Sequence, residues 1–152
     1  MGQVGNFVTI KNGLVKAYFD KWGALGVLYA LSEGSQEMEK WLTSLELTDT
    51  LDGVFAEGGF LADYDQKNLI IFGFEYDFED KTYAEMHAAC EVGIESYLKF
   101  ISRYWQGWKL TFDYNGITSF KEYLDQKQII ELKFLLSRNQ MEKPPPPIVV
   151  YA

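Results

Sequence analysis

Alternating apolar and polar residues in two parts of the chain predict β-hairpins. The runs NFVTI and LVKAYFD flank residues 11–13, and the Asn-Gly pair between these β-prone runs is a strong signal for a two-residue hairpin turn. A second hairpin is predicted with strands at Phe60–Tyr64 and Leu69–Phe74, because the polar residues 65–68 between them favour a turn. The glycines at 58–59 are expected to bend the chain before this second hairpin.

Apolar residues that recur every three or four positions predict one long helix, from Thr82 to near Arg103. Its apolar row contains Cys90 and Gly93, and the charged residues fall on the other positions. A glycine in a helix interior costs about 1 kcal/mol relative to alanine. We therefore expect Gly93 to allow close packing of this helix against a sheet.

Two short helices are also predicted. Ser35 is expected to cap the first, and its inward residues follow at positions i, i+3, i+4 and i+7: Met38, Trp41, Leu42 and Leu45. Ser119 and Glu122 match a capping box that opens the second helix. Its inward residues are expected to be Phe120, Tyr123 and Leu124.

Two further segments favour strands: WKLTFDY at 108–114, because its residues alternate, and IIELKFLL at 129–136, because it is short and has a β-branched start. Residues 25–31 show no decisive pattern. Strands and helices are mixed without the regular alternation of a doubly wound sheet, which predicts the α+β class. The expected fold is a mostly antiparallel sheet built from hairpins, with one long and two short helices packed on one face.

All four prolines lie in one run at 144–147, which separates the sequence IVVYA from the rest of the chain. We therefore predict a single α+β domain at 1–143 and a proline-rich tail at 144–152. The tail has two interpretations, a ligand for a proline-reading domain and a strap whose apolar residues add an edge strand to the domain. The strap is favoured, because a β-branched apolar run left in water promotes aggregation.

The chain has 152 residues, of which 22 are acidic and 14 basic, and its net charge is −8. Nucleic acids and anionic membranes are bound mainly by clustered lysine and arginine, so this charge argues against both as partners. Cys90 is the single cysteine, which indicates a reducing compartment. Neither a signal peptide nor an apolar run of about 20 residues is visible. We therefore expect a cytoplasmic protein.

Candidate catalytic groups are few. The single histidine, His87, lies three residues before Cys90, but a catalytic zinc site typically has three protein ligands. Because Cys90 falls on an apolar row, the pair is predicted to be a core cysteine beside a flanking histidine. No serine-hydrolase or phosphate-loop motif is present. The sequence DYD at 63–65 resembles a calcium loop, but Asn68 stands where that loop requires glycine, which favours a hairpin turn. No catalytic residue, metal ligand or cofactor is expected.

The acidic excess is concentrated in the middle of the chain. Residues 51–100 contain eleven acidic and three basic residues, and their net charge of −8 equals that of the whole chain. The segment FEYDFEDKTY interleaves acids with aromatic side chains, which are typical anchors of protein-binding surfaces. Both a docking surface for a basic protein and a solvated cluster that partly caps a helix fit this pattern. The candidate contact residues are Glu75, Tyr76, Asp77, Phe78, Glu79, Asp80, Tyr83 and Glu85.

Three stretches, YFDKWGAL, EGGFLADYDQKNLIIFGFE and YWQGWKLTFDYNGITSFKEYL, resemble small bacterial immunity proteins of polymorphic and contact-dependent toxin systems. The matching residues are Trp22-Gly23, Glu57-Gly58-Gly59, Asp63 with Asp65, Phe72-Gly73, and Trp105 to Trp108. These are mainly glycines and aromatic residues that shape a fold. Because such proteins vary their binding surface with each partner, the resemblance implies a function without assigning contact residues.

The leading hypothesis is a non-enzymatic immunity protein that neutralises a cognate toxin through its acidic aromatic surface. One alternative is a carbohydrate-binding or small-ligand-binding protein, or a hydrolase, that uses paired carboxylates and tyrosines of the same acidic segment. A pocket flanked by Trp105, Trp108 and two inward-facing acids would favour this alternative. Another alternative is a scaffold module that recruits a partner through its proline-rich tail. The sequence leaves the oligomeric state open.

Overall fold

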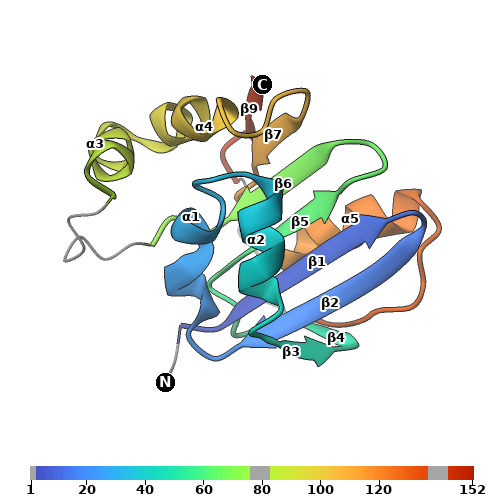
Figure 1. The fold of residues 1–152 in the computed structure, drawn as a ribbon. Helices are drawn as coiled ribbons and strands as arrows, with labels where there is room; N and C mark the ends of the chain where they lie inside the picture. Colours follow the sequence, from blue (N-terminus) through green and yellow to red (C-terminus); the bar gives the residue numbers. More distant parts are fainter. Residues whose placement is uncertain (1–2, 76–82, 137–143) are drawn as a thin grey trace.

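The computed structural model describes residues 3–75, 83–136 and 144–152 (Figure 1). Within these ranges a seven-stranded sheet has the order β3-β2-β1-β5-β6-β7-β9, and a separate two-stranded sheet pairs β4 with β8. The strands are β1 (Gly5–Lys11), β2 (Leu14–Asp20), β3 (Glu46–Thr48), β4 (Thr50–Gly53), β5 (Gly58–Asp63), β6 (Asn68–Phe72), β7 (Lys109–Phe112), β8 (Lys133–Leu136) and β9 (Ile148–Tyr151). The helices are the 3-10 helix η1 (Gly23–Gly26) and α1 (Val27–Ala30), α2 (Ser35–Leu42), α3 (Ala84–Val92), α4 (Ile94–Ser102) and α5 (Ile117–Gln126). The α+β class is therefore confirmed.

Both predicted hairpins are present. In the first, β1 and β2 pair antiparallel, and Asn12 and Gly13 between them have φ angles of 54° and 74°. Two successive positive φ angles are typical of the type I′ turn that an Asn-Gly pair favours. In the second hairpin β5 pairs antiparallel with β6, although each strand ends before the predicted boundary.

The two hairpins are joined by a parallel pairing between β1 and β5, in which Gly5 lies opposite Gly58. A second parallel pairing joins β6 to β7, so the sheet is mixed and the expectation of a mostly antiparallel sheet is wrong. Parallel pairing requires a long connection that returns the chain to the same end of the sheet. Strand β2 returns the chain to the end of the sheet where β1 begins, and residues 21–57 then lead through η1, α1, α2, β3 and β4 to the start of β5.

Close approach of the backbones explains the glycines at the start of β5. Gly58 and Gly59 were expected to bend the chain, but they are buried residues of the strand. A Cβ atom on Gly59 would overlap the backbone carbonyl oxygen of Asn6 on β1. Only glycine therefore allows the parallel pairing at this position.

Helices cover both faces of the large sheet, so the expectation of helices on one face is wrong (Figure 1). Residues of α1, α2 and α4 pack with Phe7 and Phe60 in one core cluster. Residues of α5 pack with the adjacent Val8 and Leu61 in a second cluster. Successive residues of a strand point to opposite faces. Because consecutive residues of β1 and β5 are apolar, both faces of these strands have to be covered.

The predicted long helix is wrong, because Gly93 divides it into α3 and α4. Gly93 has φ 148° and ψ −177°, a backbone conformation reached essentially only by glycine. A Cβ atom added to Gly93 would meet nothing within 4 Å, so the expected close packing against a sheet is wrong as well. With η1 and α1 between 23 and 30, the described residues contain more than the three predicted helices.

The short helices bury predicted inward residues but begin at residues other than those predicted. Gly34 and Gly116, with φ angles of 96° and 60°, precede α2 and α5, and neither helix has a side-chain cap. The predicted caps at Ser35 and Ser119 are therefore wrong, and the Ser119 hydroxyl instead donates to the carbonyl oxygen of Gly116. The buried residues of these helices include Met38, Leu42, Phe120 and Leu124, as predicted.

The strap interpretation of the chain's final segment is confirmed. Strand β9 pairs antiparallel with β7 at the edge of the large sheet, and its Ile148 and Val150 pack against the core. The strand predicted within IIELKFLL is also confirmed, since β8 pairs with β4 in the second sheet.

Candidate functional site

The predicted acidic surface lies partly outside the described residues. Tyr76, Asp77, Phe78, Glu79 and Asp80 belong to the range that the structure does not describe. The other three candidates flank this range: Glu75 is exposed after β6, Tyr83 directly precedes α3, and Glu85 lies in the first turn of α3.

Tyr83 is fixed by an aromatic contact between α3 and α1. Its ring meets the edge of the Tyr29 ring at a centroid distance of 5.0 Å. The Tyr29 hydroxyl in turn forms a hydrogen bond of 3.0 Å with Nε2 of His87 on α3. The buried histidine therefore helps to position the start of α3 against α1.

Two hollows adjoin at Tyr83 and Glu33, which line both of them. The first, of about 290 Å³, lies between α3, α4 and the loop before α2, and the second, of about 210 Å³, lies between α1 and α2. We call the combined feature the Tyr83 groove. Its lining residues are Gly26, Tyr29, Ala30, Ser32, Glu33, Glu37, Trp41, Tyr83, Ala84, Glu85, Met86, Phe100 and Tyr104.

The charge of the Tyr83 groove is negative, and its carboxylates are accessible. Glu33 is exposed and has no ion pair among the described residues. Glu37 pairs with Lys40 at 3.0 Å and Glu85 pairs with Arg103 at 3.7 Å, both at the surface. Exposed pairs of this kind contribute little to stability, so their carboxylates can exchange partners at small cost.

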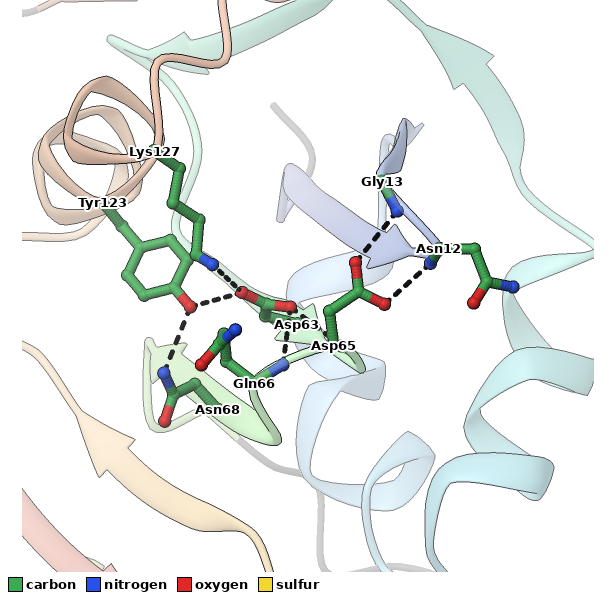
Figure 2. A network of polar contacts seen from close by, with 8 residues as sticks. All are labelled: Asn12, Gly13, Asp63, Asp65, Gln66, Asn68, Tyr123 and Lys127. Carbon is green, nitrogen blue, oxygen red and sulfur yellow. Dashed lines mark hydrogen bonds and ion pairs between the residues drawn. The ribbon is translucent and has the colours of Figure 1, made fainter.

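The DYD sequence forms the hairpin turn that was predicted for it (Figure 2). The Asp63 side chain is fully buried, and its Oδ1 accepts hydrogen bonds from the backbone N–H groups of Asp65 and Gln66. Its Oδ2 accepts a hydrogen bond of 2.5 Å from the Tyr123 hydroxyl and lies 2.9 Å from Nζ of Lys127. Burial alone would raise the pKa of Asp63, but these contacts outweigh it and lower the pKa below its ordinary value.

Asp65 joins the two hairpin turns. Its carboxylate accepts hydrogen bonds from the backbone N–H groups of Asn12, at 2.7 Å, and Gly13, at 2.9 Å (Figure 2). Both carboxylates of the DYD sequence are thus used within the fold. In the part of the chain that the structure describes, no group of three or more His, Cys, Asp or Glu side chains is placed to hold a metal ion.

The remaining candidate chemistry belongs to the core. Cys90 is buried, as predicted, and burial raises the pKa of its thiol to about 11, so the thiolate is scarce near neutral pH. Trp105 and Trp108 are also buried, and the indole N–H of Trp105 donates to the carbonyl oxygen of Leu31. These tryptophans therefore do not flank the open pocket that the carbohydrate alternative requires. No helix within the described ranges has the length and apolar character to cross a bilayer.

The sequence found part of the Tyr83 groove and missed the rest. Glu85 and Tyr83 were predicted from the acidic aromatic segment, whereas Tyr29 lies in the segment 25–31, which has no decisive pattern, and Glu33 lies between that segment and the helix predicted after Ser35. Comparisons with family models, curated proteins and solved structures found no match to this chain. Its function is therefore argued from the site alone.

Proposed function

We propose that this chain is a non-enzymatic protein-binding protein that docks a basic partner in the Tyr83 groove, most concretely an immunity protein that neutralises a toxin. The observation that carries the proposal is the position of Glu33, an exposed carboxylate between two aromatic-lined hollows that has no ion pair among the described residues. The acidic segment at 75–80 ends three residues before Tyr83 in the chain and adds negative charge to the same part of the sequence.

Lysine and arginine side chains suit this groove for two reasons. Carboxylates form charge-assisted hydrogen bonds with them, and arginine binds carboxylates with particular geometric specificity. Aromatic rings also attract cations, and the Tyr104 ring in the groove is 47% exposed. Opposite charge further accelerates association with a cationic protein and makes it sensitive to salt. The proposed place of action is the cytoplasm, which agrees with a single, buried cysteine.

The test measures whether this protein protects cell growth from a toxin. If a gene beside that of this chain encodes a secreted toxin, the toxin is expressed in cells with and without this protein. We expect the protein to restore growth, and a variant with both Glu33→Lys and Glu85→Lys to lose at least tenfold of this protection. The purified variant should keep the wild-type unfolding temperature, because both side chains are exposed.

The matched control reverses two other exposed carboxylates, with Glu122→Lys and Glu131→Lys. This variant has the same net charge but is altered on α5 and after it, and we expect full protection. Equal protection by both double variants would refute the assignment of the groove. A neighbourhood without a toxin gene, or growth that the protein does not restore, would refute the immunity function.

A further inference from the structure

A separate hollow of about 310 Å³ lies where α2 meets the first hairpin, and we call it the hairpin hollow. Its floor is formed by side chains of β1 and β2, including Thr9, Lys16 and Tyr18. Its walls are formed by Glu39 and Leu42 of α2, by Tyr64 after β5, and by neighbouring residues. Small-molecule sites have volumes of about 300 to 1,000 Å³, so this volume suits a molecule of one ring.

The charges in the hairpin hollow leave one cation without a partner. Nζ of Lys11 lies 3.1 Å from Oε1 of Glu39 and 5.0 Å from the centre of the Tyr64 ring. Lys16 has no ion pair among the residues that the structure describes. Because Lys11 and Glu39 neutralise each other, the net charge of the lining is positive, although the whole chain has a net charge of −8.

Two tyrosines give the hollow an aromatic lining with polar ends. Burial, followed by the charge of Glu39, raises the pKa of Tyr18. Burial, followed by hydrogen bonding to Glu39 and then the charge of Glu39, raises the pKa of Tyr64. Both phenols are therefore neutral donors near neutral pH. The Tyr64 hydroxyl is buried and lies beside the Glu39 carboxylate.

We propose that the hairpin hollow binds a small aromatic monocarboxylate, with its carboxylate at Lys16 and its ring between the apolar and aromatic side chains of the lining. A single negative charge on the ligand matches the ammonium group of Lys16, which has no ion pair among the described residues. A phosphate would carry a second charge, which the nearby Glu39 carboxylate disfavours. The apolar body matches Leu14, Leu42 and the two tyrosine rings, which line the hollow together.

The experiment titrates the protein with phenylacetate and records backbone amide shifts by NMR. We expect the largest shifts at residues of the hollow, including Thr9, Lys16 and Thr43. Two probes of similar shape serve as comparisons: benzyl alcohol, which is neutral, and phenethylammonium, which is positively charged. Each is expected to bind at least fivefold more weakly than phenylacetate.

Lys16→Gln is expected to weaken phenylacetate binding at least fivefold. The control Lys21→Gln removes the same charge from an exposed lysine outside the hollow and should leave the affinity unchanged. Unfolding curves of both variants show whether the fold is kept. The proposal is overturned if phenylacetate at millimolar concentration shifts no amide of the hollow, if benzyl alcohol binds equally well, or if the two lysine variants bind alike.

Discussion

Tyr123 donates a hydrogen bond of 2.5 Å to the fully buried carboxylate of Asp63, and this contact ties α5 to the turn between β5 and β6. The amide of Asn68 donates to the same tyrosine oxygen at 3.1 Å, from the other side of the turn. With Lys127 also facing Asp63, a buried negative charge has both a counter-ion and hydrogen-bond donors (Figure 2). Such a charge is stable in the core only when it is satisfied in this way.

Removing the Tyr123 hydroxyl is expected to destabilise the protein. Tyr123→Phe leaves the ring in place but deprives Asp63 of one donor, so the free energy of unfolding should fall by about 1–3 kcal/mol. Urea denaturation followed by circular dichroism measures the change. The control Tyr114→Phe, at a more exposed tyrosine, should change stability by less than about 0.5 kcal/mol. Equal effects of the two substitutions would contradict the role of the contact.

Stability is also expected to fall in acid because of Asp63. Its pKa is lower in the folded state than in the unfolded chain, where an aspartate has a pKa of about 3.9. The stabilisation is therefore present above that value and is lost as the pH decreases through the lower, folded-state pKa. Urea denaturation at pH 7, 5, 4 and 3 measures this loss.

Variants of Asp63 and of its partner Tyr123 separate the contribution of Asp63 to acid sensitivity from that of the other acidic residues. Asp63→Asn should be less stable at pH 7 and should lose less stability between pH 5 and pH 3 than the wild type. Tyr123→Phe should lose an intermediate amount, because it removes one of the contacts that lower the pKa. Glu131→Gln, an exposed control, should keep the wild-type dependence. Parallel curves for all four proteins would show that Asp63 does not contribute.

Gly93→Ala distinguishes a broken helix from a continuous one by whether it lowers or raises the free energy of unfolding. In a continuous helix alanine would stabilise the protein by about 1 kcal/mol. At φ 148° alanine is strained, so we expect a destabilisation of about 1–3 kcal/mol. Because a Cβ atom there meets nothing within 4 Å, overlap with neighbours does not contribute. Thermal or urea unfolding gives the sign, and a gain in stability would contradict the break.

Neighbouring valines of β9 test whether the strap is part of the core. Val150 packs against the main core cluster, whereas Val149 is 39% exposed. Val150→Asp places a charge against apolar side chains and should lower the free energy of unfolding by at least about 2 kcal/mol. Val149→Asp should lower it by less than about 1 kcal/mol. If the two variants unfold alike in urea, β9 does not pack as described.

The sequence predicted the local elements of the fold better than their arrangement. Asn12 and Gly13 specify a hairpin by their own backbone preferences, so this hairpin is readable without the rest of the chain. The parallel pairing of β1 with β5 depends on residues more than fifty positions apart and leaves no periodic signal. The prediction for Gly93 was wrong for a different reason, since a glycine in an apolar row fits both close packing and a helix break.

The sites were predictable only where their residues lie together in sequence. The acidic aromatic segment around Tyr83 has a visible composition, and two of its described residues do line a groove. Glu33 and Tyr29 reach that groove from a distant segment through the packing of α1 against α3. The hairpin hollow combines Lys16, Glu39 and Tyr64 from three separate segments, and no sequence pattern connects the three residues.

The parallel pairing of β1 with β5 also has a consequence for how the chain folds. Each hairpin closes through a short turn, an event of microseconds. The pairing of Gly5 with Gly58 instead closes a loop of more than fifty residues, which is entropically costly and slow. Until it forms, both hairpins have exposed edges and uncovered apolar faces. The period before this closure is when the nascent molecule is most vulnerable to aggregation.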